Sequence, residues 1–440
     1  MRKTSTLKPN LFEKIFKLKE HNTNIKTEIM AGITTFMTMA YILVVNPMIL
    51  ADAGMDKGAV FVATALSAVI ATFVMGLLAN YPIALAPGMG LNAFFAYTIV
   101  IEFGYTWQFA LCAVFIEGLL FILLTVTNLR EKIVDCIPAN LNHAVTAGVG
   151  LFIAYVGLSN ANIVVDGSLG DMHNSLVLLT LGGLLLTSIL VAKNKKGALL
   201  ISMLLVSVAG MILGLVDLPS AIASFNIPSI EPVFLKAFAV PTSKIFSLDM
   251  LIIVITLLFV DLFNTVGCLV GVAAKGDLLD ENGKMPRVKD AMMADAIGTT
   301  VGALLGTSTV TSFVESAAGI GEGGKTGLTA ITTAVLFLLS LFFAPLFTAI
   351  PTQATAPLLI VVGVMMASSF KEIDFSDYTN AIPAFITFIL MPLTNSIGDG
   401  IIFGILSYTL LKVATNKKED VSTSMIVLSI IFVIKFIVLG

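Results

Sequence analysis

Residues 81–95 read YPIALAPGMGLNAFF and interrupt an otherwise apolar part of the chain. The two prolines and two glycines of this stretch cannot all belong to one continuous helix, because proline removes a backbone donor and glycine weakens the hydrogen-bond ladder. We expect an extended stretch up to about Gly90 and a short helix that opens near Asn92. Irregular backbone at membrane depth is stable only where protein or an aqueous cavity satisfies its polar groups. This segment is therefore predicted to line a binding site.

The composition of the whole chain is that of a membrane protein. Of 440 residues, 57% are hydrophobic and 12% are charged, and the mean hydropathy is +0.99. A soluble domain carries about a quarter charged residues. The net charge of −3 gives no sign of a nucleic-acid partner. The composition indicates one membrane domain in contact with the lipid bilayer.

Apolar runs of roughly 16 to 22 residues, long enough to cross a bilayer core, recur along the chain. We place about fourteen of them at 28–50, 58–79, 84–101, 107–128, 139–157, 174–192, 197–216, 248–272, 291–305, 308–321, 327–349, 354–369, 380–395 and 398–413. A further apolar stretch, 423–439, is left open as a last span or a helix on the membrane surface.

Loop charges predict the orientation. Basic residues crowd the N-terminus and follow the fourth, sixth, eighth and fourteenth segments: Arg2, Lys3, Lys8, Lys14, Lys17, Lys19, Lys26, Arg130, Lys132, Lys193, Lys195, Lys196, Lys275, Lys284, Arg287, Lys289, Lys412, Lys417 and Lys418. The opposite loops carry Asp52, Asp56, Asp166 and Asp171. Cytoplasmic loops are enriched in Lys and Arg, so the N-terminus is expected in the cytoplasm.

The spacing of the segments suggests a duplication. The first and eighth segments start about 220 residues apart, as do the third and tenth, and seven is odd, so a second set of seven enters the membrane inverted. The sequence thus predicts an all-α polytopic membrane protein with a 7+7 inverted repeat. We divide it into a basic N-terminus (1–27), a first repeat (28–216), an outward connection (217–247), a second repeat (248–413) and a C-terminal tail with an apolar helix (414–440).

The tenth segment is irregular in the same way as the third. Residues 306–316 read GTSTVTSFVES, a run of hydroxyl groups ahead of Glu315, and Thr311 or Ser312 is a natural N-cap. Two half-helices that meet from opposite sides would aim their N-terminal N–H groups at one point. A polar substrate is expected to bind at that point.

Two intramembrane acids complete the predicted site. Asp261 lies inside the eighth segment and Glu315 inside the tenth, and an intramembrane carboxylate is costly enough to indicate function. Asn264 and Thr265 share a helical face with Asp261. No Lys or Arg lies within either span, so both carboxyl groups suit proton exchange in a proton-coupled carrier.

The remaining polar residues are given structural roles. Glu117 is expected to pack or to hydrogen-bond between helices, and Asp295 and Asp399 are expected to lie at the interface near segment ends. The scattered residues Cys112, Cys136, Cys268, His21, His143 and His173 show no metal-binding spacing. We expect no metal and no cofactor other than the coupling proton.

Three stretches carry a resemblance to a known family. Residues 31–47 (AGITTFMTMAYILVVNP), 86–95 (APGMGLNAFF) and 307–316 (TSTVTSFVES) resemble the AzgA-like purine permeases of nucleobase–cation symporter family 2, the xanthine/uracil permease superfamily. The likeness runs from about residue 10 to 420. It implies a core domain of segments 1–4 and 8–11 and a gate domain of segments 5–7 and 12–14.

The resemblance also implies a function: proton-driven uptake of hypoxanthine, guanine or adenine across the bacterial cytoplasmic membrane by alternating access. In such proteins the acids of the eighth and tenth segments contact the base, which here are Asp261 and Glu315. The Gly-x-Asn motif of the third segment falls on Gly90 and Asn92. The substrate-binding set is Asp261, Glu315, Gly90, Leu91, Asn92, Phe313 and Val314, supported by Asn264, Thr265, Thr311 and Ser312. Phe94, Phe95 and Phe313 could stack on the base.

The site chemistry leads us to expect Asp261 to carry the proton and Glu315 to grip the base. Alternatives remain: an anion carrier of the sulfate or bicarbonate type with this kind of fold, a uracil or xanthine transporter, or a channel. No nucleophile–base pair or metal motif indicates an enzyme. The preferred purine, and whether the protein works as a monomer or a homodimer, are left open.

Overall fold

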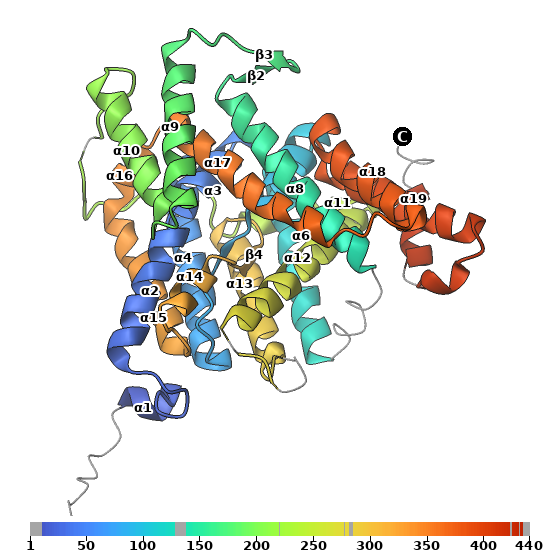
Figure 1. Ribbon diagram of the computed structural model, residues 1–440, viewed down its shortest axis with the longest axis horizontal. Helices are drawn as coiled ribbons and strands as arrows, with labels where there is room; N and C mark the ends of the chain where they lie inside the picture. Colours follow the sequence, from blue (N-terminus) through green and yellow to red (C-terminus); the bar gives the residue numbers. More distant parts are fainter. Residues whose placement is uncertain are drawn as a thin grey trace, which may run out of the picture.

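The computed structural model describes residues 11–127, 138–219, 221–276, 278–280, 285–422, 425–430 and 432–433. Within them the chain is mostly helical (Figure 1). Nine helical stretches in this part of the chain are long and apolar enough to span a membrane: Ile25–Asp52, Lys57–Ala79, Trp107–Val126, Ala139–Asn160, Ser175–Ala192, Leu248–Ala273, Gly327–Thr348, Thr352–Glu372 and Ile397–Ala414. Met89–Glu102, Ala198–Ile212 and Tyr378–Thr394 are shorter apolar helices.

The elements of the first half are α1 (Leu11–Phe16), α2 (Ile25–Met39), α3 (Ile42–Asp52), α4 (Lys57–Val74), η1 (Met75–Ala79), β1 (Leu85–Pro87), α5 (Met89–Ala93), η2 (Phe94–Glu102), α6 (Trp107–Val126), α8 (Ala139–Asn160), β2 (Val164–Val165), β3 (Ser168–Leu169), α9 (Ser175–Ala192) and α10 (Ala198–Ile212). Those of the second half are η3 (Lys236–Phe238), α11 (Thr242–Ile245), α12 (Leu248–Lys275), α13 (Val288–Leu305), β4 (Val310–Ser312), α14 (Ser316–Gly321), α15 (Gly327–Ser340), η4 (Leu341–Phe343), α16 (Ala344–Thr348), α17 (Thr352–Ala367), η5 (Ser368–Glu372), α18 (Tyr378–Thr394), α19 (Ile397–Ala414) and η6 (Lys418–Asp420).

Two short strands, one from the third segment and one from the tenth, lie side by side near the centre of the molecule, and we call this strand pair the strand crossing. β1 and β4 pair antiparallel, with Ala86 opposite Thr311, and the ladder continues through Gly88 N–H to the Thr309 carbonyl and Phe313 N–H to the Ala84 carbonyl, both at 3.0 Å. This pairing satisfies backbone groups that no helix satisfies, as irregular backbone away from water requires. The extended stretches expected in the third and tenth segments are therefore both present.

The helices that leave this crossing start at other residues than the sequence suggested. α5 begins at Met89, ahead of the expected start near Asn92, because Gly88 takes the extended N-cap conformation and Gly90 is already helical. Thr311 and Ser312 lie in β4 and do not cap a helix; Glu315 occupies the N-cap position of α14.

The first long segment is also interrupted, which was not predicted. α2 ends at Met39, and Ala40 and Tyr41 separate it from α3, which begins at Ile42. The break places the Tyr41 side chain, 1% exposed, in the interior.

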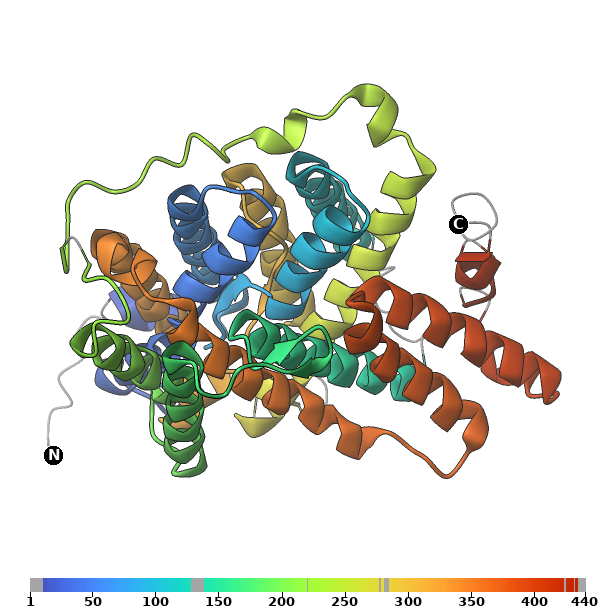
Figure 2. The same ribbon diagram turned by 90° about the horizontal axis from the view of Figure 1, so that it is seen from above.

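The helices form two packed groups. In the large bundle, α13 packs on α6 and α4, α15 packs on α2 and α4, and α14 packs on α2. In the small bundle, α8 packs on α17 and α18, α17 on α9, α9 on α10, and α18 on α19; the teal α8 lies beside the orange α17 (Figure 2). The bundles meet where α8 contacts α5 and where α10 contacts α2. Residues 221–247 arch over one edge of the molecule (Figure 2).

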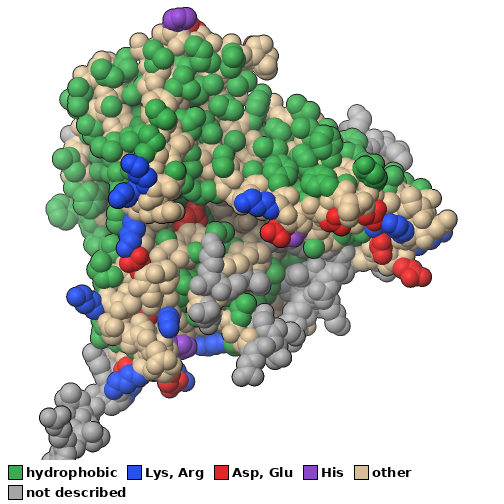
Figure 3. Space-filling view, viewed as in Figure 1, with side chains coloured by type: hydrophobic (Ala, Val, Ile, Leu, Met, Phe, Trp, Pro, Cys, Tyr) green, Lys and Arg blue, Asp and Glu red, His purple; other side chains and the backbone are tan. Residues whose placement is uncertain are grey.

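α1 and the β2–β3 hairpin lie at opposite ends of the molecule (Figure 1). α1 lies at the bottom of Figure 1 and the β2–β3 hairpin, within the predicted outward loop 158–173, lies at the top. Apolar side chains cover much of the upper part of the surface, and charged groups gather lower down (Figure 3). Several of the predicted topology residues, namely Arg2, Lys3, Lys8, Arg130, Lys132 and Lys284, and also Cys136, lie outside the described residues.

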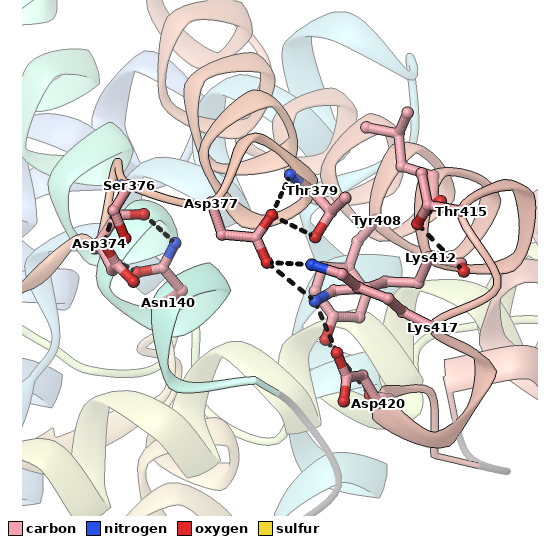
Figure 4. A network of polar contacts seen from close by, with 11 residues as sticks. Asn140, Asp374, Ser376, Asp377, Thr379, Tyr408, Lys412, Thr415, Lys417 and Asp420 are labelled. Carbon is pink, nitrogen blue, oxygen red and sulfur yellow. Dashed lines mark hydrogen bonds and ion pairs between the residues drawn. The ribbon is translucent and has the colours of Figure 1, made fainter.

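A polar network joins three helix ends of the small bundle (Figure 4). Asn140, at the start of α8, exchanges two hydrogen bonds with the Asp374 backbone. Asp377, the N-cap of α18, binds Lys417 at 2.7 Å, and the buried Lys412 lies 2.8 Å from Asp420. The start of α8, the start of α18 and the end of α19 therefore lie close together (Figure 4). Beyond this network Ser429 donates to Thr409 at 2.8 Å, so the described C-terminal residues pack back on α19.

Candidate functional site

The third-segment part of the site centres on Asn92. Its side chain is fully buried one turn into α5, and its Oδ1 accepts a hydrogen bond from the Ser308 hydroxyl of the tenth segment. Its Nδ2 has no hydrogen-bond partner among the described residues. Buried amide N–H groups are nearly always paired, because an unmade hydrogen bond costs about 1–3 kcal/mol. Asn92 is thus a donor suited to a ligand acceptor.

Gly90 and Leu91 lie where the two bundles meet. A Cβ built on Gly90 would lie 2.5 Å from Cγ1 of Val149, on α8, so only glycine allows this close approach. The Leu91 side chain is 1% exposed and belongs to the main hydrophobic core. The structure therefore gives Gly90 and Leu91 a packing role at the bundle boundary, next to Asn92.

A cluster of polar side chains lies behind β4. The Thr265 hydroxyl oxygen is 3.2 Å from Oδ1 of Asp261, 3.0 Å from Oδ2 of Asp295 and 2.9 Å from the Thr311 hydroxyl. Asn264 reaches the same Thr311 hydroxyl at 3.4 Å. Both carboxyl groups are fully buried. One hydroxyl has a single proton, so Thr265 can donate to only one of the two acids at a time.

The expectation that Asp295 is interfacial is wrong. Its side chain is 0% exposed and lies two turns into α13, which begins at Val288. The predicted segment began at 291, one turn before Asp295, so the residue was placed too close to the membrane surface. Because α13 packs against the strand crossing, this acid faces Thr265 instead.

Glu315 lies at the edge of the site. Its Oε1 accepts a hydrogen bond from the Tyr41 hydroxyl at 2.6 Å. Its side chain makes no capping hydrogen bond to α14, although it occupies the N-cap position. The preceding Val314 is 57% exposed, whereas Phe313 is 5% exposed. Glu315 is therefore the acid of the site nearest to open surface.

Glu117 was expected to pack or to hydrogen-bond between helices; the Thr309 hydroxyl, which lies outside any helix, donates to its Oε2 at 2.8 Å. Its partner belongs to the irregular tenth segment, which the sequence did not indicate. Of the proposed stacking residues, Phe94 packs beside Gly398 of α19 and Phe95 is fully buried. These two rings fill the interior.

Sequence reasoning missed three contributors, Tyr41, Asp295 and Ser308. An acid inside the ninth apolar segment was a usable signal for Asp295, once the helix start was placed one turn earlier. Tyr41 and Ser308 carried no such signal, because neither is charged and their partners lie far along the chain. In the described part of the chain no group of three or more His, Cys, Asp or Glu side chains could hold a metal ion.

Buried polar groups at a strand crossing, set between two helical bundles of a membrane-spanning chain, define a solute carrier. The chain belongs to the Permease family (Xan_ur_permease), whose model matches residues 26–402. The Methanocaldococcus jannaschii permease MJ0326 is 50% identical, over 97% of this chain and 98% of that protein. The guanine/hypoxanthine permease PbuG of Bacillus subtilis is 44% identical (96% and 99%), and the adenine permease AdeP of Escherichia coli is 40% identical (99% and 98%). This chain is a multi-pass membrane permease and not an enzyme.

Solved structures show the fold. The transmembrane domain of the cyanobacterial bicarbonate transporter BicA superposes with a TM-score of 0.63 at 16% identity, covering 87% of this chain and 97% of that chain. At this identity the likeness concerns the fold alone.

Proposed function

We propose that this permease takes up a purine nucleobase together with a proton across the bacterial plasma membrane by alternating access. Its relatives PbuG and AdeP are named for guanine, hypoxanthine and adenine. The observation that carries the proposal is the strand crossing, which brings the buried amide of Asn92 and the acids Glu315 and Asp261 into one region. A neutral base offers N–H groups to a carboxylate and ring acceptors to an amide N–H.

The two acids are proposed to have different tasks. Glu315, beside the exposed Val314, grips an N–H edge of the base. Asp261, bridged to Asp295 by Thr265, carries the proton, because these buried carboxyls can share and release one. Asn92 donates from the opposite side of the crossing, and Phe313 supplies an apolar contact.

Acids at the crossing weigh against the anion carrier. A site for sulfate or bicarbonate would hold a cationic group or no acid at all, whereas Asp261 and Glu315 both lie in this region, and the described residues of β1, α5, β4 and α14 include no Lys or Arg. The likeness to a bicarbonate transporter concerns backbone arrangement only. A uracil or xanthine carrier remains the second candidate, because the hydrogen-bonding edge of those bases is similar.

For the architecture, we propose fourteen segments in two inverted sevens. Twelve of the fourteen segments are the apolar helices named above. The other two are α13, which is the ninth segment, and β4 with α14, which together form the tenth. The large bundle corresponds to the core domain and the small bundle to the gate domain. An N-terminus in the cytoplasm follows from loop charge; cysteine labelling at position 195 from outside intact cells would contradict it.

Alternating access would exchange contacts at the two ends of the boundary. At the end near the β2–β3 hairpin, the Tyr97 ring, whose hydroxyl donates to Asp52 at 2.8 Å, meets Phe152 of α8 edge-on across the boundary. At the other end, Lys196 before α10 pairs with Glu322 after α14 at 2.6 Å. We propose that rocking of the small bundle breaks the contacts at one end when the site opens to that side, and remakes them when the site opens to the other side.

The test is uptake of labelled hypoxanthine and adenine by cells that lack their own purine carriers, each competed with unlabelled guanine, uracil, xanthine and inosine. We expect saturable uptake, counterflow, competition by purine bases but not by inosine, and loss of accumulation when a protonophore is added. Uptake of bicarbonate or sulfate in place of purines, or flux that does not saturate, would overturn the proposal.

A further inference from the structure

We propose that Tyr41 is a positioning residue for Glu315: it occupies one carboxylate oxygen and leaves the other to hold a single N–H group of the substrate. The inference rests on the proposed function, since it takes Glu315 as the acid that grips the base. It adds a residue from the first segment, which contributed nothing to the site predicted from the sequence.

The geometry of the pair is that of a strong hydrogen bond. The Tyr41 hydroxyl lies 2.6 Å from Oε1 of Glu315, within the range of about 2.5–2.7 Å for a hydroxyl that donates to a carboxylate. Tyr41 is 1% exposed, so water does not compete for the bond. Tyr41 lies at the turn between α2 and α3, where Ala40 and Tyr41 both keep right-handed helical backbone angles.

The two residues are held at a fixed separation by the helices that carry them. A Cβ on Gly319 of α14 would lie 2.5 Å from the Ala31 carbonyl and 2.1 Å from the Thr35 hydroxyl of α2. The helices therefore pack closely at Gly319, where only the Thr35 hydroxyl and the α2 backbone lie against α14. Thr38, one turn before the break, also places its hydroxyl 3.4 Å from the Glu315 carbonyl. Because α2 and α14 belong to the large bundle, the bond persists while the small bundle moves.

A fixed donor on Oε1 has a consequence for binding. A free carboxylate rotates and can accept through either oxygen, but this one is held with Oε2 as the remaining acceptor. The orientation is prepared before the base arrives, which lowers the entropic cost of binding. Tyr41→Phe keeps the ring volume and removes only the hydroxyl, so the core stays filled.

The first measurement is equilibrium binding of labelled hypoxanthine to purified protein, with uptake kinetics in proteoliposomes. Tyr41→Phe is expected to weaken binding and raise KM roughly tenfold or more, with the maximal rate largely kept. Tyr105→Phe is the matched control, because Tyr105 also donates to a carboxylate, that of Asp249, on other elements. It is expected to bind like the parent protein.

A double-mutant comparison separates positioning from a structural role. In the Glu315→Gln background there is no carboxylate left to orient, so adding Tyr41→Phe is expected to cost no further affinity. Losses that simply add would overturn the inference, as would a Tyr41→Phe protein that binds hypoxanthine like the parent. Thermal melting of each variant shows whether it is folded, and the comparison with Glu315→Gln holds for any variant that folds. If the parent binds no purine at all, the proposed function fails and this inference fails with it, whereas a parent that binds purine and a Tyr41→Phe protein that binds it equally well overturn this inference alone.

Discussion

The two segments that form the strand crossing contribute strands of equal length but continue into helices of unequal length. β1 and β4 each contribute three residues to one antiparallel ladder. Beyond β1, α5 and η2 continue without a break from Met89 to Glu102, and Asn92 is fully buried there. Beyond β4, α14 has only six residues, and Val314 ahead of it is 57% exposed. The third segment thus offers a fixed donor from the interior, and the tenth offers an acid at an open edge.

The largest expected effect tests the proposed division of tasks between Asp261, which lies behind β4, and Glu315, which follows β4 in the chain. Asp261→Asn should abolish pH-driven accumulation while some purine binding remains, because we propose that this interior acid carries the proton. Glu315→Gln should weaken binding itself by about 1.5–3 kcal/mol, as expected for a lost hydrogen bond to a charged group. Both variants are compared in binding and in uptake with and without a pH gradient. If Glu315→Gln binds normally and only coupling fails, the two roles are reversed.

The next effect sharpens the description of the interior cluster. Asp295→Asn should impair coupling about as much as Asp261→Asn, because both acids depend on the Thr265 hydroxyl. Thr265→Val should impair it less, since both carboxyls remain. The matched control is Asp399→Asn, at the start of α19 in the other bundle. Coupling that survives Asp295→Asn would show that Asp295 has no part in proton transfer.

Close packing at the boundary gives a smaller, repairable effect. In Gly90→Ala the new methyl group would press on Val149, and overpacking of this kind costs about 1–3 kcal/mol. Uptake should fall several-fold with little change in binding. Adding Val149→Ala should restore part of the rate, because it removes the atom in the way. A Gly90→Ala protein with full uptake would mean that the bundles do not need this approach.

The smallest effect concerns the ion pair at the far end of the boundary. Lys196 and Glu322 are 59% and 32% exposed, and exposed pairs contribute at most about 1 kcal/mol. Glu322→Gln should therefore change uptake by no more than about fivefold, and exchanging the two charges should return it to the parent value. The change should be smaller at high salt, which screens the pair. A larger loss that charge exchange does not repair would assign Glu322 a different role.

Much of this architecture could be predicted from the sequence. The apolar runs were visible from hydropathy, and the two irregular segments from their clustered prolines, glycines and hydroxyl residues. The acids Asp261 and Glu315 were visible because carboxylates are rare in spans. What could not be predicted is the side-chain pairing, because it depends on distant partners: Thr265 with Asp295, Tyr41 with Glu315 and Ser308 with Asn92. The starts of α5 and α14 were also misplaced. Gly88 and Glu315 occupy their N-cap positions without a side-chain capping hydrogen bond, so residue preferences for the N-cap did not reveal them.

The strand crossing also sets an order of events during synthesis. The Ala84 N–H donates to the Ser316 hydroxyl at 3.0 Å, and these partners are 232 positions apart in the chain. The third segment therefore leaves the ribosome with extended backbone whose partner does not yet exist. Until the tenth segment arrives, those groups depend on water or on the insertion machinery, and a pairing this distant in sequence forms late. Truncated chains that stop short of β4 should be the ones that cellular quality control removes.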